Sequence, residues 1–465
     1  MIVLTHAILS VLKRGLIFLG LALLGYGIYY VGLMVDILTG FGAKQLCSCV
    51  FVAQRTPASA LENELNRFPY TLASYEVNDQ EQWAGSQLGF WQQRRAVYRD
   101  GLGCVLLVDN NQSPTSLRFT PPALKNKFLP ESHTTTQVDY NQIEQTLDEF
   151  FSEPDSNQLQ NTKAVVVVYR DTLVAERYAP GFTRDTRMPG WSMAKSVTSA
   201  LIGILVRQGR LTVDDPALVS PWRAADDGRG DITIDDMLRM RSGLAWNESY
   251  FTVSDVTRML FMSEDMAEVA IQQPLAYPPG TEWYYSSGTT NVLYNIIRQA
   301  TGENYLQFPY QELFSPLGMR TAVWETDLSG TPVGSSYLFA SARDWAKFGL
   351  LYLNDGVWQG QRILPEGWVS YTATPVAQAP FRKYGAHFWL NVGEAGNPQN
   401  RLFPDVPPDM LFAEGFDGQN VFIIPSRDLV IVRLGVTTKG NFDQNRFLSE
   451  LLRAFPRPED KIVSY

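Results

Sequence analysis

The stretch that decides the fold is Gly190-Trp191-Ser192-Met193-Ala194-Lys195-Ser196, which leads directly into the apolar segment 197–206. Apolar side chains recur in that segment at helical spacing and predict a buried helix with Ser192 at its first turn; they are Val197, Ala200, Leu201, Ile204 and Leu205. Ser192 and Lys195 are three residues apart, and residues at that spacing share one face of a helix. A desolvated lysine amine has a lowered pKa and can take a proton from a serine hydroxyl. The stretch therefore predicts a serine nucleophile activated by a lysine base.

The same stretch has a simpler interpretation, in which the serine only caps the helix and the lysine follows by chance. Ser-x-x-Lys is short enough to occur often without function, so it remains a hypothesis until further motifs support it. Under the catalytic interpretation, the free N–H groups and the positive dipole end of the helix would stabilise the negative charge that develops during acyl transfer.

The composition indicates a globular enzyme without a nucleic-acid partner. The chain has 465 residues, of which 45% are hydrophobic and 12% aromatic, enough to bury a large core. The net charge is -9 and no basic stripe is interleaved with aromatic residues, which argues against binding to nucleic acid. The histidines are isolated, and neither Cys-x-x-Cys nor His-Glu-x-x-His occurs, so we expect no metal ion and no cofactor. The histidines are His6, His133 and His387.

An apolar run near the N-terminus predicts a membrane anchor. Residues 15–35 carry no charge, and about 20 such residues cross a bilayer as a helix. Lys13 and Arg14 precede the run, so the positive-inside rule leaves the short tail in the cytoplasm and the rest of the chain outside it. We therefore expect a single-pass protein of the bacterial inner membrane whose catalytic domain faces the periplasm. A cleaved signal peptide is the alternative, although its apolar core usually has about 7–15 residues.

These observations divide the chain into four expected segments. They are a cytoplasmic tail (1–14), a transmembrane anchor (15–35), a membrane-proximal collar (36–136) and a catalytic domain (137–465). The collar carries no recognisable chemistry, and we interpret it as packing between the membrane and the catalytic domain.

The cysteines allow one disulfide bond outside the cytoplasm. The chain has Cys47, Cys49 and Cys104, and Cys104 is the only partner distant in sequence. We favour a bond between Cys47 and Cys104 that leaves Cys49 free. The alternative, three buried and reduced thiols, stays open.

The order of the expected elements favours an α+β fold. Apolar patterns and turn residues predict a helix at 138–151, a strand hairpin at 164–178, a largely helical middle, a second hairpin at 420–434 and a final helix at 443–455. Helices at the two ends of a sheet-forming chain pack together on one face of the sheet. We therefore expect an antiparallel sheet covered by the two terminal helices.

Three separated motifs now stand in order: Ser192-Met193-Ala194-Lys195, Tyr285-Ser286-Ser287 and Gly415-Phe416-Asp417-Gly418-Gln419. With them, residues 140 to about 456 resemble the penicillin-recognising serine hydrolases of the beta-lactamase-related family. That family includes class C beta-lactamases, family VIII esterases, D-aminopeptidases and 6-aminohexanoate-dimer hydrolase. The resemblance implies a beta-lactamase/transpeptidase-like fold, in which an antiparallel sheet flanked by helices carries a mostly helical subdomain, here preceded by one transmembrane helix.

The resemblance also implies roles for individual residues. Ser192 is the acylated nucleophile, Lys195 holds or relays its proton, and Tyr285 exchanges a proton with the leaving group and later activates water. The backbone N–H groups of Ser192 and Phe416 form the oxyanion hole. The expected substrate-binding residues are Tyr250, Ser287, Gly415, Gly418 and Gln419.

Departures from the class C pattern narrow the expected substrate. Ser287 stands where those enzymes have asparagine, and Ala413-Glu414-Gly415 stands where they have Lys-Thr-Gly. Without that lysine, and with an acid beside it, a carboxylated beta-lactam would be held poorly. The pattern is closer to 6-aminohexanoate-dimer hydrolase and the family VIII esterases, so we expect a small amide or ester substrate.

Several functions remain possible on these residues. A beta-lactamase, a D-amino-acid peptidase and a non-catalytic cell-wall receptor would all use the same fold. Gly190-Trp191-Ser192-Met193-Ala194 is also close to the Gly-x-Ser-x-Gly elbow of α/β-hydrolases. That mechanism needs a downstream histidine, for which only His387 is available.

Overall fold

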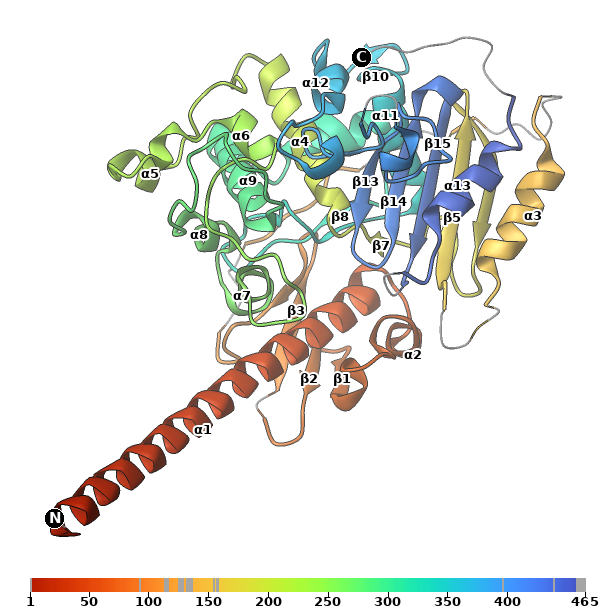
Figure 1. Ribbon diagram of the computed structural model, residues 1–465. Coiled ribbons are helices and arrows are strands. Elements are labelled where there is room, and N and C mark those ends of the chain that lie inside the picture. Colours follow the sequence, from red (N-terminus) through yellow and green to blue (C-terminus); the bar gives the residue numbers. More distant parts are fainter. Residues whose placement is uncertain are drawn as a thin grey trace.

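The computed structural model describes residues 2–91, 93–112, 117–123, 129–130, 137–153, 155, 159–394, 397–437 and 440–456. A long N-terminal helix, α1 (Ile2–Cys47), projects from a body that contains the other described elements (Figure 1). By length and composition, one helix near the N-terminus of the described chain, within Leu12–Val52, is apolar enough to cross a membrane.

Helix α1 has two parts with different surroundings. Large apolar side chains are exposed from Leu12 to Val31, whereas Val35 and Phe41 are buried against the body. The helix therefore continues well beyond residue 35, where the uncharged run ends. It does so because its second part is the core of the region that follows, not an isolated span.

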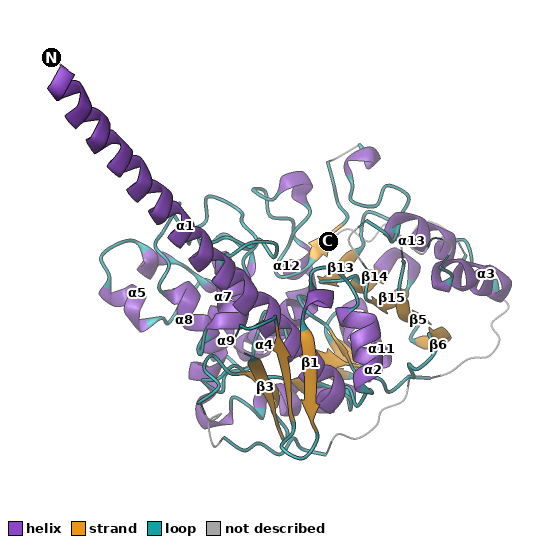
Figure 2. Cartoon of the chain, turned by 90° about the horizontal axis from the view of Figure 1, so that it is seen from below, coloured by secondary structure: helices purple, strands orange, loops and turns teal. Residues whose placement is uncertain are grey.

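A four-stranded antiparallel sheet packs against the buried part of α1 (Figure 2). Its strands, in spatial order, are β1 (Ser74–Asn78), β2 (Trp83–Gln87), β3 (Arg94–Arg99) and β4 (Gly103–Leu106). Between α1 and this sheet the chain forms short helical turns that include α2 (Pro57–Ala60) and a π-helix, Leu61–Leu65. The collar is thus a folded layer around the end of α1.

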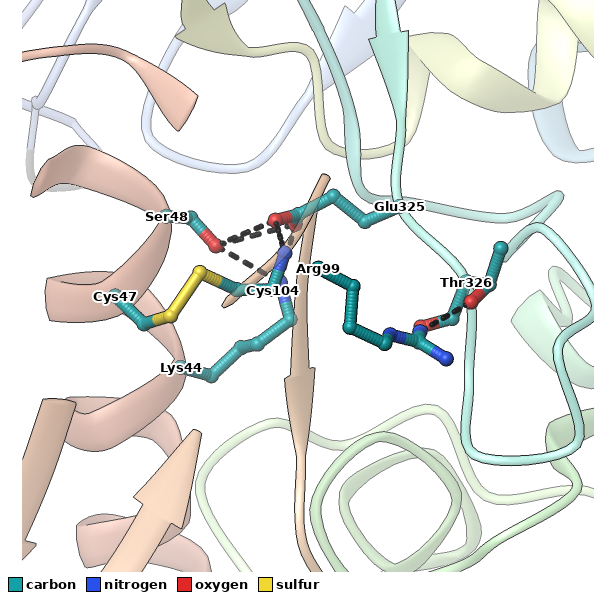
Figure 3. The surroundings of a disulfide bond; sticks show 7 residues. All are labelled: Lys44, Cys47, Ser48, Arg99, Cys104, Glu325 and Thr326. Carbon is teal, nitrogen blue, oxygen red and sulfur yellow. Dashed lines mark hydrogen bonds and ion pairs between the residues drawn. A yellow bond between two sulfur atoms is a disulfide. The ribbon is translucent and has the colours of Figure 1, made fainter. Parts of the chain in front are cut away.

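A disulfide bond and a buried ion pair fasten the end of α1 (Figure 3). Cys47 is bonded to Cys104 of β4, and Cys49 is free and buried. The Glu325 carboxylate is fully buried and accepts hydrogen bonds from the amine of Lys44, from Ser48 Oγ at 2.9 Å and from the Cys104 backbone N–H at 2.7 Å. The helix end, the collar sheet and the segment after β8 (Val323–Trp324) are thereby joined at one point.

The main sheet has six strands and is antiparallel throughout its described pairs, which confirms the predicted fold class. Its spatial order is β12 (Trp389–Leu390), β13 (Leu411–Gly415), β14 (Gln419–Ile424), β15 (Leu429–Gly435), β5 (Thr162–Tyr169) and β6 (Thr172–Tyr178). The terminal helices α3 (Tyr140–Phe151) and α13 (Gln444–Leu452) pack together on one face. Helices α4 (Met193–Arg207) and α11 (Ala342–Leu353) cover the other face.

The middle of the chain forms the helical subdomain. Its helices are α5 (Ser220–Ala224), α6 (Ile234–Leu238), α7 (Asp255–Met262), α8 (Met266–Ile271), α9 (Ser287–Thr301), α10 (Ser315–Leu317) and α12 (Trp368–Ala373). Short strand pairs connect them to the body: β7 (Met188–Pro189) and β8 on either side of β9 (Leu338–Ala340), and β10 (Val357–Trp358) with β11 (Gln361–Arg362). Helix α6 begins with a capping box between Thr233 and Asp236.

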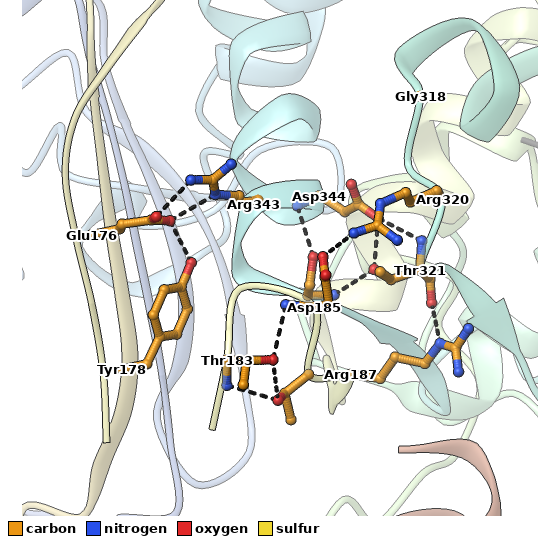
Figure 4. A network of polar contacts seen from close by, with 12 residues as sticks. Glu176, Tyr178, Thr183, Asp185, Arg187, Gly318, Arg320, Thr321, Arg343 and Asp344 are labelled. Atoms are coloured by element: carbon orange, nitrogen blue, oxygen red, sulfur yellow. Dashed lines mark hydrogen bonds and ion pairs between the residues drawn. The ribbon is translucent and has the colours of Figure 1, made fainter. Parts of the chain in front are cut away.

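Polar contacts join β6 to α11 and fasten the segment before Ser192 (Figure 4). Glu176 of β6 accepts hydrogen bonds from Arg343 of α11 at 2.7 Å and from Tyr178 at 2.6 Å. Arg187 donates to the carbonyl of Thr321 at 2.8 Å and to that of Val52 at 3.0 Å. The second of these bonds links the segment just before the Ser192 stretch to the collar.

Candidate active site

Ser192 lies at the N-terminal end of α4, as the sequence predicts. The five residues of the predicted apolar stripe are all fully buried in the core between α4 and the main sheet. Ser192 is the N-cap residue, but its side chain accepts no capping hydrogen bond. The Lys195 amine instead lies 3.0 Å from Ser192 Oγ. The interpretation of Ser192 as a simple cap is therefore wrong.

The Lys195 amine is buried among three oxygen atoms. It lies 3.0 Å from Ser192 Oγ, 2.9 Å from Ser287 Oγ and 3.1 Å from the Ser335 carbonyl, and the side chain is 1% exposed. Burial lowers the pKa of Lys195 to about 8, against an opposing effect of the Glu248 charge. A neutral amine has two N–H donors and one lone pair, so it can donate to Ser287 and Ser335 and accept from the Ser192 hydroxyl. That arrangement is the one required of a base poised to remove the serine proton.

The Tyr285 side chain lies over the same amine. Lys195 Nζ is 4.8 Å from the centroid of the Tyr285 ring, and the ring stacks on Trp389 at 5.5 Å. Burial, then the Glu248 charge, raises the pKa of Tyr285, although a hydrogen bond with Ser192 lowers it. The phenol therefore keeps its proton at neutral pH and can donate it.

Strand β13 passes close to the turn in front of Ser192. A Cβ atom built on Gly415 would overlap the Gly190 carbonyl oxygen, so only glycine permits this close passage. Within the described residues, the backbone N–H groups of Ser192 and Phe416 donate to no protein acceptor. Two free donors thus lie where β13 passes the turn that carries Ser192.

Of the predicted substrate-binding residues, Tyr250 and Ser287 lie in the site. The Tyr250 ring stacks on the Phe416 ring at a centroid distance of 5.6 Å. Ser287 is fully buried, and its hydroxyl lies between Lys195 and Glu248. Ser287 therefore contacts the base, where the resemblance implied contact with the substrate.

Gly418 and Gln419, also predicted to bind substrate, support the turn after β13. The Gln419 side chain is 1% exposed, and its amide donates to the Phe416 carbonyl at 3.2 Å and accepts from the Gly435 N–H at 3.2 Å. Gly418 has φ of +84°, and a Cβ atom there would overlap the Arg433 guanidinium. The side-chain positions of both residues face the body of the protein. They therefore hold the turn in place, whereas the resemblance implied that they contact the substrate.

Glu248 is a site residue that the sequence motifs did not reveal. Its carboxylate accepts hydrogen bonds from the Ser287 N–H at 2.9 Å, from the Ser287 hydroxyl and from Tyr250 at 3.3 Å. It also accepts from the Trp246 indole. Alternation of Trp246, Glu248 and Tyr250 in an extended loop would place the three side chains on one side, and that alternation is the sequence signal for Glu248.

His387 takes no part in this arrangement. Its Nδ1 lies 2.7 Å from the Leu238 carbonyl and its Nε2 lies 2.9 Å from Thr290 Oγ1, so both ring nitrogens are occupied. Burial lowers its pKa to about 3. The α/β-hydrolase alternative is therefore wrong. Among the residues that the structure describes, no group of three or more His, Cys, Asp or Glu side chains could hold a metal ion.

Comparison with known proteins agrees with this geometry. A family model described as Beta-lactamase matches residues 148–452. The 6-aminohexanoate-dimer hydrolase of Paenarthrobacter ureafaciens is 26% identical over 295 residues, which are 59% of this chain and 72% of that protein. The D-aminopeptidase of Brucella anthropi is 27% identical over 168 residues, 34% of this chain and 32% of that protein. The structure of EstCE1, a hydrolase with promiscuous acyltransferase activity, superimposes with a TM-score of 0.55 at 16% identity. The match covers 68% of this chain and 98% of the EstCE1 chain, and it shows that the two share a fold.

The lowered pKa of Lys195 predicts a pH dependence. Because only the neutral amine can accept the serine proton, the acylation rate should rise about tenfold per pH unit below pH 7 and level off above about 8. Single-turnover acylation with an uncharged ester, measured from pH 5.5 to 9.5, tests this. His387→Gln should keep the profile, since the residue lies outside the proton path. A rate that is flat from pH 6 to 9 would exclude Lys195 as the base.

Proposed function

The chain belongs to the beta-lactamase family, and from this premise we propose that it is a membrane-anchored serine hydrolase that cleaves small amides or esters. The observation that carries the proposal is the buried contact between the Lys195 amine and Ser192 Oγ, at 3.0 Å, beneath the Tyr285 ring. A nucleophile, a base and a protonated acid then lie within one small volume, as acyl transfer requires.

The proposed reaction has two half-reactions. In acylation, Ser192 Oγ attacks the substrate carbonyl carbon while Lys195 takes its proton, and the carbonyl oxygen becomes an oxyanion. Backbone N–H groups of Ser192 and Phe416 stabilise that oxyanion, an effect worth about 10²–10³ in rate per donor in such enzymes. Tyr285 gives its proton to the departing amine or alcohol and is reprotonated from Lys195. In deacylation the same groups move a proton from water, which attacks the acyl carbon and releases Ser192.

The charge distribution favours an uncharged or amine-bearing substrate. The Glu248 and Glu414 charges are both among the causes that raise the Tyr285 pKa, so two carboxylates act on the site. Strand β13 supplies Ala413 and Glu414 where a penicillin-binding strand supplies lysine and threonine. A substrate carboxylate would therefore meet repulsion without a compensating ion pair. The similarity to 6-aminohexanoate-dimer hydrolase supports a linear amide.

A D-amino-acid peptidase is the second candidate. The similarity to a D-aminopeptidase supports it, and the two carboxylates would suit the free amine of an amino-acid amide. A beta-lactamase is disfavoured by the same two carboxylates. A non-catalytic receptor is disfavoured because the proposed base, acid and nucleophile lie in mutual contact.

The exposed part of α1 supports the membrane anchor. Its exposed apolar length, from Leu12 to Val31, corresponds to about 30 Å of helix, the thickness of the hydrocarbon core of a bilayer. Lys13 and Arg14 at its start favour a cytoplasmic N-terminus. The disulfide bond at the other end of α1 suits an oxidising compartment such as the periplasm.

The nucleophile can be tested by labelling. A fluorophosphonate probe should label Ser192, identified by peptide mass spectrometry, and Ser192→Ala should abolish labelling while the protein stays folded. Lys195→Ala should slow labelling at least about 100-fold, since a general base contributes about 10²–10⁴. Ser199→Ala, a buried serine on the same helix, is the matched control and should label normally. Labelling of any other serine would refute the assignment.

Substrate preference can be tested on the same preparation. We expect short p-nitrophenyl esters, linear amides or amino-acid amides to have a higher kcat/KM than penicillins or cephalosporins. The missing ionic contact is worth about 1.5–3 kcal/mol, or about tenfold to a hundredfold. Glu414→Lys should shift the ratio toward carboxylated substrates. A cephalosporin cleaved as fast as the best ester would restore the beta-lactamase interpretation.

The membrane topology predicts two further results. Protease added to spheroplasts should degrade the catalytic region, and the full-length chain should stay with the membranes after an alkaline wash. A soluble chain shortened near Ala43 would show that the N-terminal segment is a cleaved signal peptide.

A further inference from the structure

Two residues beside the proposed oxyanion hole have backbone conformations that non-glycine residues seldom adopt. Trp191, directly before Ser192, has φ of +48°, and Asp417, directly after Phe416, has φ of +63°. Left-handed backbone at such residues persists only where surrounding contacts hold it. Each residue adjoins one of the two backbone N–H donors, so the contacts that hold Trp191 and Asp417 also fix the direction of those donors.

Arg67 of the collar holds Asp417. Its guanidinium donates two parallel hydrogen bonds to the carboxylate, from Nη1 to Oδ1 at 2.8 Å and from Nη2 to Oδ2 at 2.6 Å. The same guanidinium lies 5.5 Å from the centroid of the Phe416 ring. The Asp417 side chain is 10% exposed and that of Arg67 is 25% exposed, so this pair is shielded from water on the carboxylate side. A bidentate pair of this kind fixes orientation as well as distance.

Phe41 of α1 holds Trp191 from the same side. The two rings are nearly parallel, with an interplanar angle of 4° and centroids 6.1 Å apart. Phe41 also stacks on Tyr70 of the collar at 4.4 Å. Trp191 in turn contacts the edge of Phe416 at 5.5 Å. The collar and the end of α1 thus contact both backbone turns that carry the proposed donors.

We propose that Arg67 is a positioning residue of the active site: by holding Asp417, it directs the Phe416 N–H toward the substrate oxyanion. Phe41 directs the Ser192 N–H in the same way, through its contact with Trp191. This inference rests on the proposed function. Phe41, Arg67 and Tyr70 lie outside residues 148–452, so the support comes from a part of the chain that the family match does not include. The collar is therefore part of the catalytic unit.

The test compares Arg67→Ala, Arg67→Lys and Asp417→Asn with the wild-type full-length protein. Arg67→Ala should lower the acylation rate about tenfold to a hundredfold, because a misdirected oxyanion donor loses part of the rate effect that a missing donor would lose. KM should change little. Affinity for an alkyl boronic acid, whose tetrahedral Ser192 adduct places an oxygen in the oxyanion hole, should fall by the same factor. Arg67→Lys, which keeps the charge but not the two parallel bonds, should recover part of both.

Arg177→Ala is the matched control. Arg177 also makes two ionic hydrogen bonds, in its case to two carboxylates, Glu144 at 2.5 Å and Asp148 at 2.6 Å, and its side chain is 23% exposed, but it lies on β6 against α3. It should leave acylation and boronic acid affinity unchanged. If Arg67→Ala proves unstable, Asp417→Asn keeps the side-chain shape and should still lower both quantities.

The outcomes separate this inference from the proposed function. A wild-type protein that forms no acyl-enzyme on Ser192 would refute the proposed function itself. The role of Arg67 alone would be refuted if the wild-type protein acylates normally and the folded Arg67→Ala and Asp417→Asn variants behave like it. In that case their acylation rate and their affinity for the boronic acid stay within about twofold of the wild-type values. Equal losses in Arg177→Ala would also refute it, because the effect would then be general destabilisation.

Discussion

The structure depends on the close passage of β13 over the backbone in front of the nucleophile. Gly190 donates its N–H to the Leu338 carbonyl at 2.7 Å, and a Cβ atom on it would overlap the Trp345 ring. On the other side, Gly415 leaves room for the Gly190 carbonyl. The turn before α4 is thus clamped between β9, α11 and β13. A side chain at Gly415 would push β13 away from the Gly190 carbonyl, and one at Gly190 would overlap Trp345 of α11, so the turn before Ser192 fits between these elements only with glycine at both positions.

Within that clamp, the second constraint is the burial of Lys195. An ammonium group far from water is costly unless acceptors surround it. The Ser192 and Ser287 hydroxyls can rotate. When the Lys195 amine is charged, these two hydroxyls and the Ser335 carbonyl all accept its hydrogen bonds; when it is neutral, the Ser192 hydroxyl donates to it and the other two accept. Glu248 lies one hydrogen bond behind Ser287 and keeps the pKa of Lys195 from falling further. Lys195 can change its protonation state without displacing these neighbours, which would keep reorganisation small in the proposed reaction.

Local sequence patterns were sufficient for the fold and for part of the site. The helical stripe from Val197 and the two strand hairpins each follow from the period of their own residues, and Ser192 and Lys195 follow from helical spacing. The contacts of Glu248 and Arg67 could not be found in that way, although the alternation of Trp246, Glu248 and Tyr250 marks Glu248 itself as a candidate. Each acts on a residue far away in sequence, Ser287 and Asp417 respectively, and no local period reports such contacts. Hydropathy likewise located the apolar part of α1 but not its continuation to Cys47, because that part contains Asp36 and Lys44, and Lys44 is buried through its ion pair with Glu325.

The continuity of α1 has a consequence for the whole molecule under the proposed topology. The helix has no break between its exposed apolar part and Cys47, and its last turns are fastened by the disulfide bond and by Glu325. A helix fastened in that way transmits orientation along its unbroken length, and α1 contains no proline, one cause of sharp kinks. Phe41, on the fastened part, stacks on Trp191 beside the nucleophile. The active site therefore has a fixed direction relative to the anchor, in contrast to a catalytic domain carried on a flexible linker, and substrates must approach it at a set height above the membrane surface.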